Sequence, residues 1–180
     1  MELNEKQLNR ETHFKGYVVN VHLDEVLLPN NKKSFREVVE HPGGVCIAAR
    51  KENGNFFIVE QYRYAFQEVT LEFPAGKLEK EENPLESAKR ELHEEIGAIS
   101  SDWLSLGTCY PTPGYCSEVI HLYFADNLSY IGQSLDENEF LNVKEFSLSE
   151  LEDMVASGEI NDSKTICLLY RLNIVSRETK

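Results

Sequence analysis

Residues 76–98 read GKLEKEENPLESAKRELHEEIGA and carry seven glutamates between Glu79 and Glu95. Like charges at this spacing repel one another and cost free energy. The rest of the protein does not offset this negative charge, because the whole chain of 180 residues carries a formal net charge of −13. Two explanations are open: a solvated acidic helix face, or a group of carboxylates that together bind something positive.

Local signals predict that this stretch forms a helix with defined ends. Asn83 is a good N-cap, Pro84 fits the first helical position, and Glu86 stands where a capping box has its acid. Gly97 can end the helix in a left-handed conformation. The helix would have about three to four turns, and its apolar stripe, with spacings typical of a helix packed on a protein body, consists of Leu85, Ala88, Leu92 and Ile96.

Three of the acids share one surface of this helix, because Glu91, Glu94 and Glu95 are three and four residues apart. Glu91 and Glu95 flank the apolar stripe and would lie near the protein body, where water screens their repulsion less. A hard divalent cation such as Mg²⁺ takes carboxylate oxygens and would turn this repulsion into a binding site.

The remaining chain predicts an α/β (α+β) protein, with helices packed on a mixed sheet and an N-terminal antiparallel sheet ahead of it. Asn53-Gly54 predicts a hairpin turn, and Ser147 with Glu150 predicts a capping box. Strands are expected at 17–28, 35–40, 45–50, 56–61, 69–73, 103–110 and 118–125, and further helices at 148–156 and 163–175.

Composition excludes several classes of function. Hydrophobic residues make up 41% of the chain and charged residues 27%, which favours a folded domain. No apolar run is long enough to span a membrane, the N-terminus has no secretory signal, and no basic stripe indicates nucleic-acid binding. The four cysteines form no C-x-x-C pair and are interpreted as reduced thiols. We expect a soluble, cytoplasmic protein.

The spacing of the acids matches a known pattern. Gly76, five residues, Glu82, seven residues and then the run RELHEEIG over 90–97 resembles the Nudix box. The one departure is Ala98, where a bulky aliphatic packing residue is usual. The resemblance implies an α/β/α sandwich in which the box forms a loop, a helix and a loop. It also implies hydrolysis of a nucleoside diphosphate linked to another group, with Mg²⁺ or a similar ion such as Mn²⁺.

The resemblance also assigns roles within the box. Glu91 and Glu95 would be the main metal ligands and part of the catalytic set, with Glu94 close to the metal. Arg90 would orient the acids through an ion pair. Glu82 belongs to the motif, and Gly76 and Gly97 would be structural.

Further short stretches, in the right order along most of 14–175, are similar to the ADP-ribose pyrophosphatase subgroup: HPGGV (41–45), EQYR (60–63), LEFPAGKLE (71–79), TPGYCSE (112–118) and LDENE (135–139). By this resemblance the backbone carbonyl of Ala75 would bind metal. Arg63 and Arg36 would contact the substrate, Glu118 the terminal ribose, and Tyr17 would stack on adenine. Lys77, Thr112 and Gly114 lie in the same motifs and join the predicted substrate-binding set.

The subgroup is dimeric, and its N-terminal sheet crosses to the partner. Residues 1–42 are therefore expected to form a dimerising β-sheet segment and residues 43–180 the Nudix hydrolase domain. Tyr17 and Arg36 would then serve the other subunit's site. In the polar loop 132–142 the resemblance makes Glu137 the general base and Glu139 a metal contact; two solvated loop acids are the alternative.

The function expected from this resemblance is Mg²⁺-dependent hydrolysis of ADP-ribose to AMP and ribose 5-phosphate. A pyrophosphatase acting on another nucleotide sugar, such as GDP-mannose, is the nearest alternative. A non-catalytic ADP-ribose sensor is the second, although such sensors tend to lose acids of the box, and this chain keeps Glu82, Glu91, Glu94 and Glu95.

Overall fold

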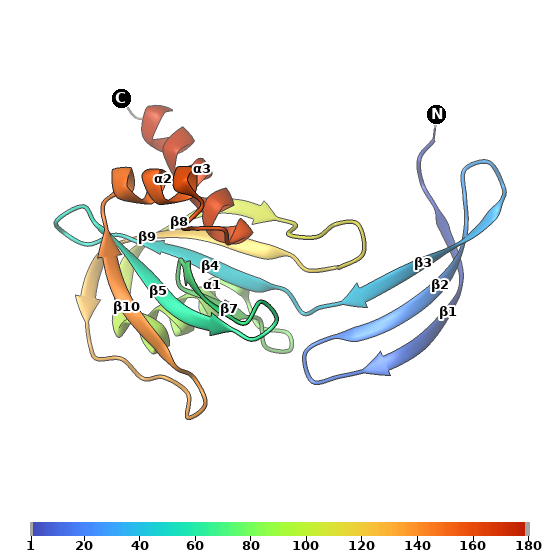
Figure 1. Ribbon diagram of the computed structural model, residues 1–180, viewed down its shortest axis with the longest axis horizontal. Helices are drawn as coiled ribbons and strands as arrows, with labels where there is room; N and C mark the ends of the chain where they lie inside the picture. The colour runs from blue at the N-terminus through green and yellow to red at the C-terminus, as the bar shows by residue number, and fades with distance from the viewer. Residues whose placement is uncertain (1, 179–180) are drawn as a thin grey trace. The chain divides into compact units, whose positions relative to one another are not determined.

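The computed structural model describes residues 2–178 (Figure 1). Met1, Thr179 and Lys180, at the ends of the two predicted segments, lie outside the described residues. The chain divides into two compact units, one formed by the chain up to Gly43 with Tyr110–Val119, the other by Gly44–Cys109 and the chain from Ile120 onward. In chain order the elements are β1 (Lys6–Lys15), β2 (Asn20–Leu27), β3 (Lys33–Glu40), β4 (Gly44–Ala49), β5 (Phe56–Arg63), β6 (Glu68–Glu72), β7 (Ala75–Lys77), α1 (Pro84–Glu91), the π-helical segment η1 (Leu92–Ile96), β8 (Ala98–Cys109), β9 (Ile120–Tyr130), β10 (Leu141–Phe146), α2 (Leu148–Ser157) and α3 (Ser163–Glu178).

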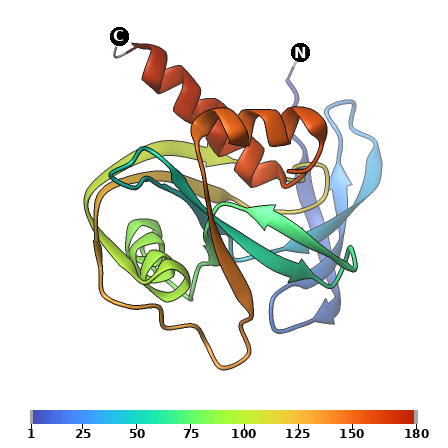
Figure 2. The same cartoon turned by 60° about the vertical axis from the view of Figure 1, so that its left-hand side comes forward.

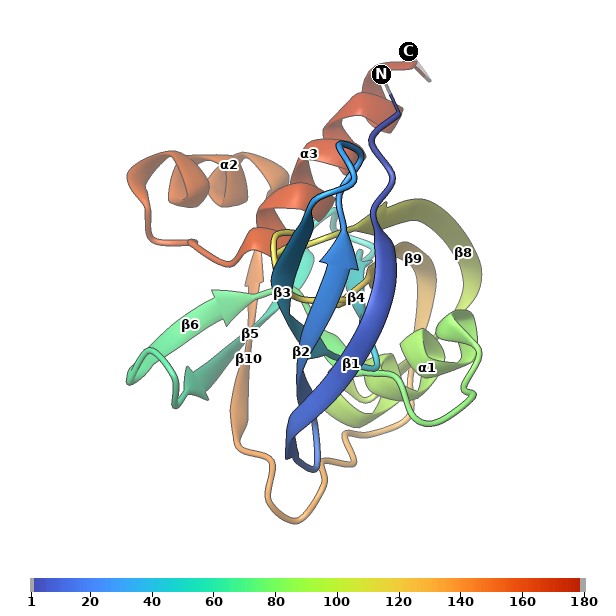
Figure 3. The same ribbon diagram turned by 90° about the vertical axis from the view of Figure 1, so that its right-hand side faces the viewer.

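The first unit is built on an antiparallel sheet in the order β1-β2-β3, seen face-on in Figure 3. Alternate residues of β2 are buried, as period-2 patterning requires. Among them is Asp24, whose carboxylate accepts hydrogen bonds from Arg10 at 2.8 and 2.7 Å, and these hold its pKa below the usual value. The predicted N-terminal antiparallel sheet is therefore present, with β1 as an additional strand.

The second unit contains two sheets. One is antiparallel, in the order β10-β5-β6, and the other is mixed, in the order β7-β4-β9-β8, with β4 and β9 parallel. Every residue of β4 is buried. Its side chains alternate between two cores: Cys46 and Ala48 join the core that includes α2 and α3, whereas Val45, Ile47 and Ala49 join the core that includes α1.

This alternation produces the layers seen in Figure 2, where α1 covers one side of the sheets and α2 with α3 the other. The predicted α/β/α sandwich with a mixed sheet is confirmed. The capping box at Ser147 and Glu150 is also confirmed. No helix in residues 2–178 is long and apolar enough to cross a membrane.

The predicted hairpin at Asn53-Gly54 is correct for the turn and wrong for the pairing. Gly54 has a positive φ of 87° and its N–H donates to the Lys51 carbonyl at 2.9 Å. Only the single bridge between Arg50 and Phe56 joins the two arms. Beyond it β4 and β5 enter different sheets, because β4 pairs instead with β7 on one side and, over its whole length, with β9 on the other.

The box helix begins as predicted but does not continue as a single α-helix. The Asn83 side chain accepts from the Leu85 N–H at 2.9 Å and Pro84 is the first helical residue. Glu86, predicted to complete a capping box, instead accepts from Lys89 at 2.7 Å. The final turn, η1, is π-helical and ends at Gly97 with a φ of 73°. The apolar stripe packs as expected, with Ala88 and Leu92 fully buried.

Candidate active site

The acids of the box face the short strand β7, whose antiparallel pairing with β4 brings it beside the helix. Gly76 lies so close to Glu91 that a Cβ on it would stand 1.9 Å from the Glu91 Cδ and Oε1 atoms. The glycine is therefore required by close approach of a carboxylate, and any larger residue would displace Glu91.

Arg90 holds three of the acids in place. Its guanidinium donates to Glu82 at 3.0 and 3.1 Å, to Glu91 at 2.7 Å and to Glu94 at 2.9 Å. It also donates to the Lys77 carbonyl at 3.3 Å, which ties β7 to the helix. The hydrogen bonds from Arg90 lower the pKa of Glu82 to about 2, and those acids raise the pKa of Arg90. This is the orienting geometry expected of Arg90.

Glu91 and Glu95 are buried carboxylates, with relative exposures of 7% and 1%. Burial raises the pKa of Glu91 to about 7 and that of Glu95 to about 8. The charge of Glu91 is partly compensated by Arg90, whereas the Glu95 Oε2 atom accepts, among residues 2–178, only from the Ala75 N–H, at 3.0 Å. Two acids held out of water with so little positive charge beside them form a site that favours a cation.

The chemistry of the donors fits a hard divalent ion, because every candidate ligand is an oxygen. Among residues 2–178, no group of three or more His, Cys, Asp or Glu side chains could hold a metal ion. Glu94 is instead turned to Arg90. The other ligands would therefore include backbone carbonyl, water and substrate oxygens, as is usual for Mg²⁺.

Arg63, at the end of β5, lies near the acids and is itself held in place. Its Nε and Nη2 atoms donate to Glu72 at 2.7 and 2.6 Å. Glu95 adds to the rise in the Arg63 pKa, so the guanidinium is within electrostatic reach of the box. Glu72 lies within LEFPAGKLE but was not among the residues predicted to have a role. An acid flanked by leucine and phenylalanine at the end of a strand was the available signal.

The loop 131–140 begins against the end of the box helix. Gln133 donates to the Glu95 carbonyl at 2.5 Å, and the Ser134 N–H donates to the Glu94 carbonyl at 3.2 Å. Glu139 is partly buried and contributes like charge to the raised pKa values of Glu91 and Glu95. Glu137 is exposed. The loop thus brings Glu139, rather than Glu137, toward the box acids.

The other predicted substrate residues lie in the first unit, apart from Lys77, whose side chain is exposed on β7. Tyr17 is fully exposed, and Arg36 donates to Glu5 at 2.5 Å and to the Phe35 carbonyl at 2.8 Å. The remaining three lie in or beside a turn after β8: the Thr112 carbonyl accepts from the Cys116 N–H at 3.0 Å, Gly114 is exposed, and Glu118 lies 3.6 Å from the His41 ring.

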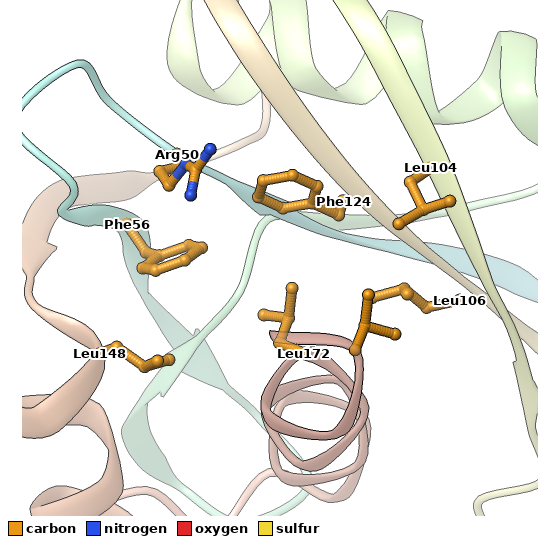
Figure 4. Close-up of a pocket in the computed structure, with 8 residues that line it drawn as sticks. Arg50, Phe56, Leu104, Leu106, Phe124, Leu148 and Leu172 are labelled. Atoms are coloured by element: carbon orange, nitrogen blue, oxygen red, sulfur yellow. The ribbon is translucent and has the colours of Figure 1, made fainter. Parts of the chain in front are cut away.

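A small cavity of about 180 Å³ lies on the α3 side of the second unit (Figure 4). Its walls are mainly apolar, including Phe56, Phe124 and Leu172, and Arg50 at its edge lies 5.1 Å from the Phe124 ring centroid. Arg50 is paired with Asp126. No acid of the box lines this cavity, so it is separate from the carboxylate site.

Comparisons with known proteins agree with this geometry. Residues 39–169 match the NUDIX domain. The chain is 37% identical to an ADP-ribose pyrophosphatase of Bacillus subtilis, covering 96% of this chain and 94% of that protein. It is 41% identical to a methanol dehydrogenase activator of Bacillus methanolicus, covering 94% and 93%.

A solved structure, that of an ADP compounds hydrolase, superposes with a TM-score of 0.87 at 21% identity over 99% of this chain and 98% of that one. This likeness supports the fold. The domain match, and the identity extending over nearly the whole length of both relatives, show more than the fold: this chain, with its box acids gathered around Arg90 and Gly76, belongs to the Nudix family.

Proposed function

We propose that this protein hydrolyses the pyrophosphate bond of ADP-ribose, giving AMP and ribose 5-phosphate, with Mg²⁺ as the preferred ion. The observation that carries the proposal is the pair of buried carboxylates, Glu91 and Glu95, beside Arg63. The name of the Bacillus subtilis relative supplies the substrate. The same proposal places the enzyme in the cytoplasm, where its four thiols stay reduced.

In this proposal Glu91 and Glu95, with the Ala75 carbonyl, hold the ion, and Glu94 and Glu139 are nearby acids that complete its surroundings. The bound ion would supply charge neutralisation of the diphosphate and a more acidic water. Arg90 and Gly76 keep the two acids in position, and the N–H of Ala75 fixes the orientation of Glu95. The raised pKa values of both acids show that burial disfavours their negative charge unless a cation offsets it.

Arg63 is the proposed phosphate clamp. Two of its donors are taken by Glu72, while the described residues provide no acceptor for its Nη1 atom. Its side chain is 38% exposed, so the remaining donor is accessible to a ligand. A guanidinium held by a buried acid on one side can donate to a phosphate oxygen on the other without first losing side-chain freedom.

A substrate panel tests the proposal directly. We expect ADP-ribose with Mg²⁺ to give the highest kcat/KM among nucleoside diphosphate compounds, with AMP and ribose 5-phosphate identified by chromatography. Preference for GDP-mannose would establish the alternative pyrophosphatase. Tight binding of ADP-ribose without turnover, with Mg²⁺ or Mn²⁺, would establish the sensor.

The general base is proposed to be Glu137, with Glu139 as a metal contact. Glu137→Gln should then lower kcat by about a hundredfold or more with little change in KM, at saturating substrate and metal. Asp136→Asn, in the same exposed turn, is the matched control and should keep its activity. If Glu137→Gln is fully active and Glu139→Gln is not, the roles are reversed. If both are active, the base must be sought among Glu79, Glu82 and Glu94.

We propose that residues 1–42 are a dimerising segment and 43–180 the hydrolase domain, with Tyr17 and Arg36 serving the partner's site. Every side chain of β1 is exposed, and Phe14 and Phe35 on this sheet are 55% and 60% exposed, an apolar surface suited to a second copy. Light scattering should give the mass of a dimer, and Phe14→Ser with Phe35→Ser should weaken it. Val69→Ser, at an exposed position of β6, should not. An active wild-type monomer would contradict this assembly.

A further inference from the structure

A buried ion network lies behind the proposed phosphate clamp. Glu72, only 2% exposed, accepts from Arg63 on one side and from the Lys164 ammonium on the other. Burial opposes ionisation of Glu72, but the bonds from Arg63 and the charge of Lys164 outweigh it and hold its pKa at about 2. Glu72 is therefore a carboxylate at every pH at which the enzyme would work, held by both cations and by the Thr70 hydroxyl, which donates to it at 2.6 Å.

Lys164 lies in the first turn of α3, and two arms of hydrogen bonds start there. The first arm is its bond to Glu72, and the second begins at Asp162. Asp162 accepts from the Lys164 Nζ atom at 2.9 Å and from the Thr165 N–H and hydroxyl at 2.9 and 2.6 Å. The Thr165 oxygen, completely buried, accepts in turn from the Phe73 N–H at 2.9 Å. One short turn of helix thus holds two consecutive residues, Glu72 by its side chain and Phe73 by its backbone.

One arm leads to the box and the other to the proposed phosphate clamp. Phe73 is followed by Pro74, whose carbonyl accepts from Ile47 at 2.8 Å, and then by Ala75, whose N–H donates to Glu95. The other arm runs from Lys164 through Glu72 to Arg63. The start of α3 therefore supports the site from the side of the sheets opposite α1.

The charges of this network balance. Arg63 and Lys164 are its cations, and Glu72 and Asp162 its anions, so its formal charge is zero. The Lys164 side chain is 14% exposed, and its ammonium already donates to two carboxylates. Lys164 therefore has little capacity to bind a ligand itself. Its removal would leave Glu72 with Arg63 as its sole cation and a net negative charge behind the clamp.

We propose that Lys164 is a positioning residue for diphosphate binding, because it shares the charge of Glu72 and so leaves Arg63 a donor and its positive charge for the ligand. This inference rests on the proposed role of Arg63 as the clamp. It concerns the supporting network, which the box motif does not include.

Lys164→Met, which removes the charge and keeps the length of the side chain, should weaken binding of inorganic pyrophosphate about tenfold, the loss expected for one weakened charge-assisted contact. Calorimetry in the presence of Mg²⁺ measures this affinity for pyrophosphate. The KM for ADP-ribose should rise by a similar factor, while kcat changes less. Lys164→Arg should restore most of the affinity. Lys144→Met, which breaks the surface pair with Glu60, is the matched control and should leave both constants unchanged.

A double-mutant cycle with Arg63→Met decides whether Lys164 acts through the clamp. In the Arg63→Met background, Lys164→Met should change pyrophosphate affinity less than about twofold, because the two residues share one route. If the double variant lost affinity by the product of the two single losses, the inference would be overturned. Unchanged pyrophosphate affinity in Lys164→Met alone would also overturn it. Circular dichroism and thermal unfolding check each fold. If Lys164→Met does not fold, Lys164→Gln, which keeps a hydrogen-bond donor, takes its place in the cycle.

The same measurements separate this inference from the proposed function. If Arg63→Met itself leaves pyrophosphate affinity unchanged, the clamp is wrong and the role of Lys164 falls with it. If Arg63→Met weakens binding and Lys164→Met does not, only the role of Lys164 is wrong. If the cycle behaves as expected while ADP-ribose is not hydrolysed, the network stands and the substrate assignment fails.

Discussion

Glu95→Gln should lower kcat by about a thousandfold, which corresponds to about 4 kcal/mol of transition-state stabilisation, and leave the fold intact. The substitution removes a charged oxygen from the proposed metal site but keeps the size of the side chain. Glu91→Gln should have an effect of similar size. Steady-state kinetics over a range of Mg²⁺ concentrations measure both changes.

The stability of the metal-free variant distinguishes a lost ligand from a damaged fold. Glu95 is 1% exposed and is poorly compensated, so its replacement by a neutral amide should not lower the thermal midpoint. Glu86→Gln, on the same helix and paired with Lys89 at the surface, is the control and should stay fully active. A Glu95→Gln enzyme with near-wild-type turnover would remove Glu95 from the metal site.

Gly76→Ala should lower activity by about a hundredfold or more with only a small loss of stability. The new methyl group would occupy the position of the Glu91 carboxylate, which is the end of a flexible side chain. The fold can therefore admit the methyl by moving the acid, and a small displacement of a catalytic group is enough for a loss of this size. Kinetics and thermal unfolding of the same preparation give the two effects separately.

Gly97→Ala provides the contrast, because the atoms that a new methyl group would meet there belong to the backbone. A Cβ at Gly97 would meet the Gln133 nitrogen at 2.4 Å, and its φ of 73° is unfavourable for alanine. In this variant, unlike Gly76→Ala, the main loss should be in stability. Combining Gly76→Ala with Glu91→Asp, which shortens the acid, should remove any destabilisation caused by the methyl group. Full activity in Gly76→Ala would show that Glu91 does not need its present position.

Local chemistry predicted the features that depend on a few neighbouring residues. Asn83, Pro84 and Gly97 mark the ends of the box helix because caps and left-handed glycines act within one turn. The Asn53-Gly54 turn was predicted for the same reason. The pairing partner of each strand was not predicted. β4 pairs with a strand 76 residues away instead of the arm beside it because of burial, which the turn does not encode.

Three strands were missed: β7, which has only three residues, and, for a related reason, β1 and β10. All residues of β1 and most residues of β10 are exposed. Neither strand therefore shows the alternation of apolar and polar residues that indicates a half-buried strand. Each is defined by hydrogen bonds to an established neighbour, β2 or β5. The network around Glu72 could not be predicted from local sequence, because Lys164 is 92 residues away and the two residues meet only after folding.

The π-helical turn between the acids sets a limit on the length of the chain there. Such a turn holds one residue more than an α-helical turn, and it is often found at functional sites. Removing one residue between Glu91 and Glu95 would tend to restore the tighter turn and displace Glu95 from its present position on the Ala75 N–H. A new side chain at His93, by contrast, leaves the path of the backbone as it is. Over these five positions, insertions and deletions are therefore far less tolerable than substitutions, and the number of residues is itself part of the site.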